Sequence, residues 1–274
     1  MKKVATIILN RNLPDVTNRL YERFQVYDAK ETDVFIVESG SSKKNLSKYY
    51  TWWANWEDSL EHGLRYPRGF NYALSQLWEG KKFQKYDYFF LVCNDAEFEQ
   101  KPIIKMLTNE MIKHPRVGIL SPCSPLWGEQ ILLNKGDTKY FWYAQFVSWF
   151  IRREYIEDIM PLEKHTYMNF LFDGENFRGY EADIELIVKG YANDWATAIT
   201  TRVLMNENET YLKTRADLMK TDPYGENLKK VLNEGKKWLR KKYGFNSRWS
   251  INLCSKFFYD QFFVYYPEFS KYKI

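Results

Sequence analysis

A short polar motif after an apolar run has the residue types needed to hold a diphosphate. Asn94 and Asp95 come just after the mostly apolar residues 86–92, separated from them by Cys93, and Glu97 lies two positions beyond Asp95. Carboxylate oxygens bind Mg²⁺ and Mn²⁺, and a divalent cation stabilises a diphosphate when it binds and when it leaves. The alternative is that Asn94 and Asp95 only end a strand and turn the chain.

A second acidic cluster has the chemistry of a general base. Asp183 opens a segment with helical spacing, and Glu181 and Glu185 lie on either side of it. A carboxylate within hydrogen-bond reach of a hydroxyl can take its proton as the oxygen attacks. The alternative is an ordinary helix start, where the helix dipole favours acidic residues.

The segments that carry these residues alternate between strand and helix patterns. Continuous apolar runs predict buried strands at residues 4–9, 33–37, 86–92 and 117–120. Helical spacing predicts helices from Pro14, over 49–64, from Arg68 and over 101–114. This repetition indicates an α/β fold with a mostly parallel sheet flanked by helices, whose ligand lies outside the carboxyl ends of the strands. The polar residues at that edge are Asn10, Arg11, Glu38, Ser39, Asn94 and Asp95.

The second half is less regular and ends in a basic, aromatic-rich segment. Strand patterns cover residues 142–151 and 195–204, with a helical pattern over 183–188 between them. Residues 224–274 contain eleven Lys or Arg and four Asp or Glu, a net charge of +7, whereas the whole chain has +5. We therefore expect a catalytic domain over residues 1–210 and a helical C-terminal extension over 211–274.

The composition excludes several classes of protein. Of the 274 residues, 45% are hydrophobic and 27% are charged, which excludes a disordered or fibrous chain. Three scattered cysteines match neither a zinc site nor a disulfide scaffold, so a reducing compartment is expected. The short apolar start favours a first strand over a signal peptide, and no apolar stretch approaches the roughly 20 residues that span a bilayer. A cytoplasmic protein is the resulting expectation.

The order of the motifs resembles glycosyltransferase family 2, whose members have the GT-A fold and use nucleotide sugars. The resemblance covers residues 3–210 and rests on five motifs in order: VATIILNRN, VFIVESGSS, RGFNYAL, YDYFFLVCNDAEF and FDGENFRGYEADIEL. The fourth is similar to the strand bearing the family's Asp-x-Asp motif, in the form seen in rhamnosyltransferase-like members. The fifth is similar to the segment bearing the catalytic base. The resemblance implies a GT-A (Rossmann-like) fold and an inverting transferase without a protein nucleophile.

The resemblance also implies roles for individual residues. Asp183 would be the catalytic base, with Glu181 as the fallback. Glu38 would accept a hydrogen bond from the N3–H of uracil or thymine, so a UDP- or dTDP-linked sugar is favoured. Donor binding is assigned to Asn10, Arg11, Glu38, Ser39, Arg68, Asn71, Asn94 and Asp95, with Arg65 as an alternative to Arg68. Acceptor binding is assigned to Trp142, Trp149, Tyr180 and Glu181.

A divalent metal, Mn²⁺ or Mg²⁺, is the implied cofactor, with Asp95, Glu97 and Asn206 as its candidate ligands. Two departures put this site in question. Cys93 stands where the first acid of Asp-x-Asp is expected, and the His that often follows the last strand is missing. Glu207 is an alternative oxygen ligand at that place. We therefore expect a metal site that is weaker than usual, or none.

Several partners and functions stay open at this stage. The leading interpretation is transfer of a sugar to a glycan or lipid-linked saccharide. A GT-A domain that binds without turnover is the second, and nucleic-acid modification or binding, motivated by the basic tail, is the least favoured. Residues 224–243 have the pattern of a basic amphipathic helix, which either contacts a membrane peripherally or packs on the catalytic domain. The aromatic run 257–266 would then be core or an oligomer contact.

Overall fold

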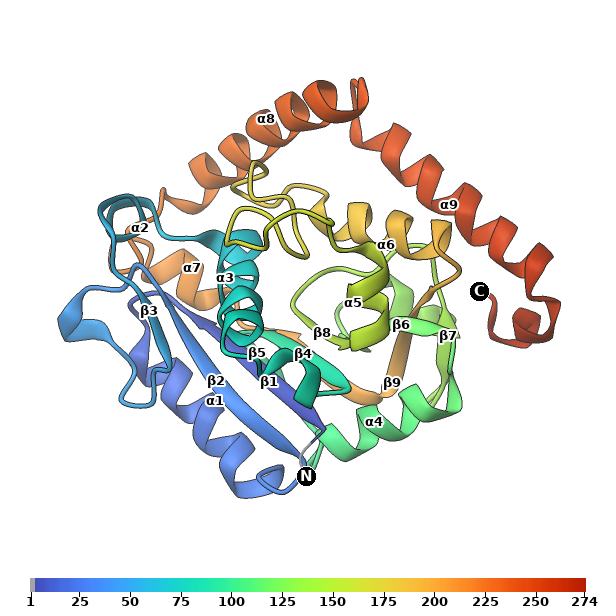
Figure 1. The fold of residues 1–274 in the computed structure, drawn as a ribbon, viewed down its shortest axis with the longest axis horizontal. Coiled ribbons are helices and arrows are strands. Elements are labelled where there is room, and N and C mark those ends of the chain that lie inside the picture. The colour runs from blue at the N-terminus through green and yellow to red at the C-terminus, as the bar shows by residue number, and fades with distance from the viewer. Residues whose placement is uncertain (1–2) are drawn as a thin grey trace.

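The computed structural model describes residues 3–274 (the side chain of Leu212 excepted) as a mixed sheet with helices on both faces (Figure 1). Within these residues the strands are β1 Val4–Asn10, β2 Thr32–Ser39, β3 Trp52–Ala54, β4 Tyr88–Cys93, β5 Ala96–Phe98, β6 Val117–Cys123, β7 Thr138–Tyr140, β8 Ser148–Arg152 and β9 Ala196–Glu207. Their order is β3-β2-β1-β4-β8-β6-β9-β5, and β7 pairs with β9. Six strands run one way, and β5, β7 and β8 run against them. The mostly parallel α/β sheet is therefore confirmed.

The helices lie in two layers and an outer arch. They are α1 Pro14–Tyr27, α2 Glu57–His62, α3 Arg65–Glu79, α4 Ile104–Lys113, α5 Arg153–Ile159, α6 Ala182–Ala192, α7 Thr210–Thr214, α8 Tyr224–Tyr243 and α9 Arg248–Tyr265. In the view of Figure 1, α1 and α4 lie below the sheet, and α3, α5 and α6 lie above it. The helices α8 and α9 form an arch outside α6 (Figure 1).

The prediction of one helix over residues 49–64 is wrong. Residues 52–54 instead form β3, which pairs in parallel with β2, and only Glu57–His62 is helical. The ring of Trp52 stacks on Phe35 with 5.1 Å between the ring centroids. The tryptophan spacing therefore arose from an edge strand followed by a short helix, a tertiary arrangement that periodicity does not distinguish from one continuous helix.

The C-terminal extension packs closely on the sheet domain. The inner side of α8 buries Trp238 and Leu239, and a Cβ added at Gly235 would lie 2.2 Å from the side chain of Tyr180. Lys242 Nζ lies 2.8 Å from a carboxylate oxygen of the buried Glu185 on α6. The apolar stripe of α8 thus faces the protein, and Gly235 allows the close approach. No helix within residues 3–274 is long and apolar enough to cross a membrane.

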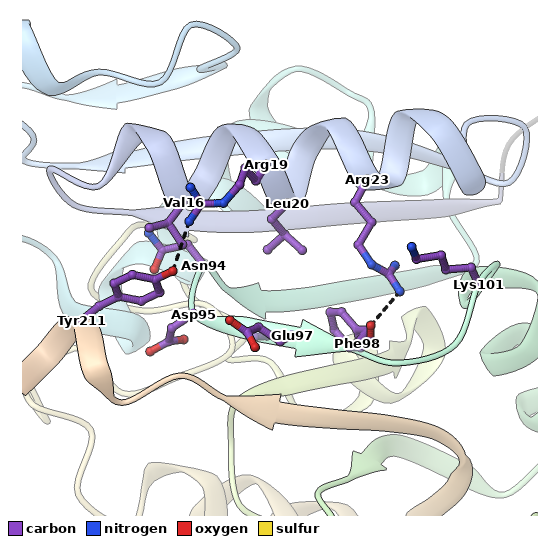
Figure 2. A pocket seen from close by; sticks show the side chains of 11 residues that line it. Val16, Arg19, Leu20, Arg23, Asn94, Asp95, Glu97, Phe98, Lys101 and Tyr211 are labelled. Carbon is purple, nitrogen blue, oxygen red and sulfur yellow. Dashed lines mark hydrogen bonds between the residues drawn. The ribbon is translucent and has the colours of Figure 1, made fainter.

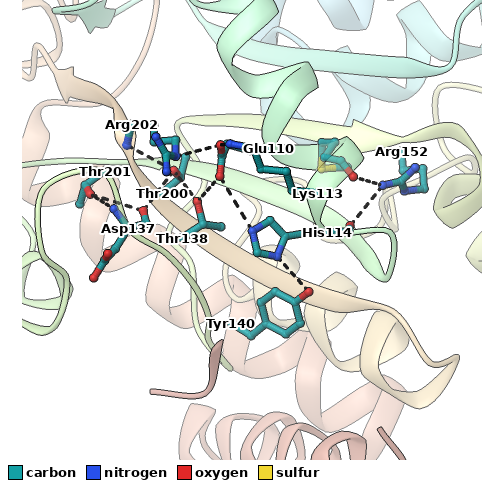
Figure 3. Close-up of polar contacts among 11 residues, drawn as sticks. Glu110, Lys113, His114, Asp137, Thr138, Tyr140, Arg152, Thr200, Thr201 and Arg202 are labelled. Carbon is teal, nitrogen blue, oxygen red and sulfur yellow. Dashed lines mark hydrogen bonds and ion pairs between the residues drawn. The ribbon is translucent and has the colours of Figure 1, made fainter. Parts of the chain in front are cut away.

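A buried carboxylate ties α4 to the sheet (Figure 3). Glu110 accepts hydrogen bonds from Lys113 Nζ at 2.7 Å and Thr138 Oγ1 at 2.9 Å, and it pairs with Arg202 Nε at 2.8 Å. Burial alone would raise the pKa of Glu110, but these partners lower it below its usual 4.5. The stability that Glu110 supplies is therefore present above pH 4.5 and is lost as the pH falls through its folded-state pKa.

Candidate functional site

A pocket opens where β1, β2 and β4 end. Asn10 is the register partner of Glu38, and Leu9 is the partner of Cys93, so three strands end at one edge of the sheet. The pocket has a volume of about 290 Å³, and the chain after α7 together with α8 forms its far wall. Its lining residues are Leu9, Asn10, Arg11, Ser39, Arg65, Tyr66, Cys93, Asn94, Asp95, Arg178, Met219, Thr221, Asn227 and Val231.

Three guanidinium groups line this pocket, those of Arg11, Arg65 and Arg178. Burial and the charge of Arg65 lower the pKa of Arg11 to about 10, and burial and the charge of Arg178 lower the pKa of Arg65 to about 10. Both groups remain charged at neutral pH. Arg178 pairs with Asp222 at 3.2 Å and Glu234 at 3.0 Å, whereas the buried Nε atoms of Arg11 and Arg65 have no hydrogen-bond partner within residues 3–274. Such partly desolvated cations favour an anionic ligand.

The local backbone is built around these arginines. Gly63 has φ +73°, and a Cβ at this position would lie 1.6 Å from Arg11 Nη1, so only glycine leaves room for the guanidinium. Arg65 itself has φ +53°, a left-handed conformation that costs a residue with a side chain roughly 1 kcal/mol. Strain of this kind is concentrated at functional sites.

Asp95 also borders a second cavity, beneath α1 (Figure 2). This cavity has a volume of about 260 Å³ and shares Asn94 and Asp95 with the first. Figure 2 shows Arg19 and Arg23 projecting from α1 toward it, and Arg19 Nη2 donates to the hydroxyl of Tyr211 at 3.1 Å. Asp95 therefore lies between two cavities that both carry basic side chains.

Asp95 and Glu207 are neighbouring carboxylates, and the charge of Asp95 disfavours ionised Glu207. Burial and the charge of Glu97 raise the pKa of Asp95 to about 6. Burial and the charges of Asp95 and Glu209 raise the pKa of Glu207 to about 7. The buried Oδ1 of Asp95 has no hydrogen-bond partner within the described residues. A divalent cation would relieve this repulsion.

These residues could supply only part of the coordination of a divalent cation, and phosphate oxygens of the substrate would have to supply the rest. Mg²⁺ is commonly bound by one or two carboxylates together with substrate phosphates and water, and Asp95 and Glu207 offer that donor set. Glu97 instead accepts a hydrogen bond from Asn208 at 2.8 Å, and Asn206 accepts one from Ser124 at 3.3 Å. Within residues 3–274, no group of three or more His, Cys, Asp or Glu could hold a metal ion.

Asp183 lies in the first turn of α6, beside the pocket wall. Burial and the charge of Glu181 raise the pKa of Asp183 to about 7, against hydrogen bonds from the Ile184 and Phe146 backbone that lower it. Burial and the charge of Asp183 in turn raise the pKa of Tyr66, a residue that lines the pocket. A carboxylate whose pKa lies near 7 is suited to general-base catalysis at neutral pH.

The C-terminal extension reaches the surroundings of Asp183. Asn252 of α9 donates a hydrogen bond to Glu181 Oε2 at 3.1 Å. Burial raises the pKa of Glu181, while Asn252 and the charge of Arg248 oppose this. Sequence reasoning assigned no site residue to α9, because nothing in the sequence shows that its first turn returns to residue 181.

Two of the residues predicted to bind the nucleotide sugar form hydrogen bonds within the protein that fix neighbouring loops. Glu38 is 0% exposed and accepts hydrogen bonds from Asn10 Nδ2 at 2.9 Å and the Ser47 backbone at 2.7 Å. Asn71 is also fully buried and bonds the backbone of residues 171 and 172. Neither lines the pocket, and their assignment to the donor stays a prediction. A side chain at a strand end or helix start often serves the adjoining loop.

The predicted arginine and two acceptor aromatics lie elsewhere than expected. Arg68 turns from the pocket, donating to the carbonyl of Gly174 at 2.7 Å and covering the ring of Phe177 at 4.7 Å. Trp149 is 0% exposed in the core, and Tyr180 is buried beneath Gly235. Trp142 is partly buried, with Ser255 bonded to its carbonyl. Arg65, the predicted alternative to Arg68, lines the pocket, while Trp149 and Tyr180 are buried away from it, and their assignment to the acceptor stays a prediction.

Other predicted residues do meet in the pocket. Asn10, Arg11, Ser39, Asn94 and Asp95 all line it. Asn94 donates to Asn10 Oδ1 and to Thr17 Oγ1, both at 3.0 Å, which fixes the turn before Asp95. Arg178 was missed: it lies in the irregular segment before α6, where periodicity gives no signal, and only its position beside Phe177 in a predicted site motif pointed to it.

The chain shares its fold with proteins of known structure. It is similar to residues 1–349 of S. aureus TarS in complex with UDP, at 12% identity over 88% of this chain and 74% of that chain, with a TM-score of 0.52. A second structure of residues 1–349 of S. aureus TarS gives 13% identity, the same coverage and a TM-score of 0.51. A mannosyltransferase from Pyrobaculum calidifontis, PcManGT, in complex with GDP-Man and Mn²⁺, matches with a TM-score of 0.46 at 13% identity over 85% of this chain and 68% of that chain. No protein-family model and no curated protein matches the sequence.

Proposed function

We propose that this protein is an inverting glycosyltransferase of family 2 that moves a sugar from a nucleoside-diphosphate donor to a hydroxyl of a glycan or lipid-linked saccharide. One observation carries the proposal: a pocket lined by Asp95 and by two partly buried arginines, whose Nε atoms have no hydrogen-bond partner within residues 3–274, lies beside a carboxylate whose pKa is about 7. The arginines could bind the negative charge of a diphosphate, and the carboxylate could take the proton of an attacking hydroxyl.

The diphosphate would lie against Arg11 and Arg65. Their unpartnered Nε atoms point to an acceptor that the protein does not supply, and phosphate oxygens accept such bonds strongly. As the bond between the sugar and the diphosphate breaks, negative charge grows on the leaving oxygen. Positive groups held in a desolvated pocket stabilise that charge more than they would in water.

A divalent cation, when bound, would add Lewis-acid stabilisation of the leaving diphosphate. Asp95 and Glu207 are the residues that would hold it: within residues 3–274, Asp95 Oδ1 is buried without a hydrogen-bond partner, and neither carboxylate has a basic side chain within salt-bridge distance. We propose Mn²⁺ or Mg²⁺ for this role, with Glu97 and Asn206 as outer partners.

Asp183 would act as the base. Its carboxylate takes the proton of the acceptor hydroxyl while the acceptor oxygen bonds to the anomeric carbon and the diphosphate leaves from the opposite side, which inverts that carbon. Glu181, held by Asn252, lies next to Asp183 and would position the acceptor. Residues 1–210 would carry the reacting groups, and the extension 211–274 would complete the walls of the site.

The donor nucleotide is proposed as uridine or deoxythymidine diphosphate. The UDP bound to a structural neighbour supports the uridine form, whereas Glu38, which first motivated the choice, is occupied by Asn10 and Ser47. A nucleotide-sugar-binding protein without turnover is the second candidate, favoured by Cys93 in place of the first acid and by the lack of a three-ligand metal cluster among residues 3–274.

A thermal-shift titration with UDP, dTDP and GDP, each with EDTA or with Mn²⁺, tests the donor site. A ligand that binds only the folded protein raises its stability with the logarithm of ligand concentration over Kd. We expect a shift with at least one nucleotide in EDTA, through the arginines, and a larger shift with Mn²⁺. No shift with any nucleotide under either condition would contradict the proposal.

A further inference from the structure

The helix α9 is apolar on two opposite faces. Its inner face buries Ile251, Tyr259 and Phe262 against the domain. Its outer face carries Trp249, Leu253, Phe257 and Val264, which are 69%, 50%, 58% and 68% exposed. With 3.6 residues per turn, these four side chains fall within an arc of about 80°. We call them the outer stripe.

An exposed apolar stripe of this length requires an explanation. A helix on the surface of a globular protein normally buries one apolar face and shows a polar one, as α8 does. Contiguous exposed apolar side chains mark contact with a partner or a membrane.

The charge of the extension indicates which partner fits. Within residues 3–274, Lys229, Lys236, Lys237 and Arg240 on the exposed side of α8 have no carboxylate within salt-bridge distance, whereas the other three lysines of α8 are paired. Residues 224–274 carry a net charge of +7. A second copy of this segment would be repelled, and an anionic surface would be attracted.

We propose that the outer stripe of α9 docks on an anionic lipid bilayer, with the unpaired basic residues of α8 facing the headgroups. An interfacial helix with Trp, Phe and Leu on one face sinks about 5–10 Å into the boundary between headgroups and acyl chains. Asp260 falls within the arc of the stripe by the same spacing, and it is neutralised by Lys256 and by Lys273 at 2.8 Å, so the stripe carries no unpaired carboxylate there.

Docking of this face would bring the membrane close to the proposed catalytic base. Asn252, on the inner side of the first turns of α9, contacts Glu181 beside Asp183, while Trp249 and Leu253 point outward. A helix with its side chains is about 10–12 Å across, so the site lies roughly one helix thickness below the docked face. This step rests on the proposed function and favours a lipid-linked saccharide as the acceptor.

Co-sedimentation of the full chain with vesicles tests the docking without any donor or acceptor. Vesicles of phosphatidylcholine alone are compared with vesicles that also contain phosphatidylglycerol, at low and high salt. We expect binding only to the anionic vesicles, weakened by salt. Because no turnover is measured, a failure here is distinguishable from a failure of the proposed transferase activity.

Two pairs of variants make the test specific. The double variant Leu253→Ser, Phe257→Ser should lower vesicle binding at least about tenfold. The matched control Ile112→Ser, Ile131→Ser replaces two apolar side chains outside α9 that are 65% and 82% exposed, and it should bind like the wild type. Lys236→Glu, Lys237→Glu should lower binding at least about tenfold, since each lysine near an anionic surface raises it roughly fivefold. Lys43→Glu, Lys44→Glu, an exposed pair on another part of the surface, is its control.

Three results would overturn the proposal. The wild type could remain in the supernatant with anionic vesicles at low salt. The stripe variant could bind as tightly as the wild type while its thermal unfolding shows that it is folded. Light scattering could also show a wild-type dimer that Phe257→Ser converts to a monomer without any vesicle binding, which would assign the stripe to a second copy of the chain.

Discussion

Replacing Asp183 by Asn removes the proposed base with almost no change in shape. The pKa of Asp183 is raised from 3.8 to about 7, so at pH 8 the wild-type side chain is ionised and able to take a proton. Asparagine cannot do so, and loss of a general base typically lowers the rate about 10²- to 10⁴-fold. Donor affinity should change little, because the arginines and Asp95, not Asp183, line the donor pocket.

The same substitution should stabilise the fold at high pH. A raised folded-state pKa means that the stability linked to Asp183 is complete below pH 3.8 and is lost as the pH rises through about 7. One pKa unit corresponds to about 1.4 kcal/mol, so ionised Asp183 costs the fold at most about 4 kcal/mol, and less because its side chain keeps some contact with solvent. Asp183→Asn should therefore unfold later than the wild type at pH 8, with a smaller gain at pH 5.

The assay combines two measurements on the same preparations. Denaturant unfolding at pH 5 and pH 8 gives the stability change, with the exposed Glu163→Gln as a control that should show none. The pH profile of kcat/KM for the wild type should rise with an apparent pKa near 7. A variant that keeps more than about a tenth of wild-type turnover would refute the role of Asp183 as base. Lower stability of the variant at pH 8 would refute the account of its burial.

Three further substitutions test other parts of the site and fold. Arg65→Ala should weaken nucleoside-diphosphate binding in EDTA roughly tenfold to a hundredfold by calorimetry; a larger loss with Arg68→Ala, on the same helix, would contradict the assignment of the pocket. Glu207→Gln should reduce the gain in diphosphate affinity that Mn²⁺ provides while leaving affinity in EDTA equal or higher, and an unchanged Mn²⁺ effect would exclude Glu207 as a ligand. Gly235→Ala should destabilise the protein by about 1–3 kcal/mol in urea, because the new methyl group would overlap Tyr180; a more stable variant would show that α8 does not pack there.

The sequence predicted the parts of the fold that depend on local pattern. Continuous apolar runs identified β1, β2, β4 and β6 to within a few residues, because strands covered on both faces have no polar alternation. Helical spacing failed at Trp52 and Trp56, where an aromatic residue of an edge strand and the one that precedes a short helix happened to share that period. The extension was correctly expected to be helical. Only the structure shows that the apolar side of α8 faces the protein, whereas α9 has one buried and one exposed apolar side.

The sequence predicted which residues gather at one edge of the sheet better than it predicted the direction of each side chain. Asn10, Arg11, Ser39, Asn94 and Asp95 line one pocket because parallel strands end at the same edge. The sequence does not show which way a side chain turns. Arg65 and Arg68 are three residues apart on α3, yet only Arg65 enters the pocket. Contacts between distant segments, such as Glu181 with Asn252, have no local signature.

Release of nucleoside diphosphate from nucleotide sugars, followed by phosphorus NMR in the presence of the diamagnetic Mg²⁺, is the sharpest test of the proposed transferase activity. The measurement needs no knowledge of the natural acceptor, since water can replace the acceptor hydroxyl in a slow hydrolysis. The account predicts that the wild type releases diphosphate from at least one UDP-, dTDP- or GDP-linked sugar, and that Asp183→Asn binds the same donor but releases far less. Release that is equal in the two proteins, or donor binding without any release, would contradict it.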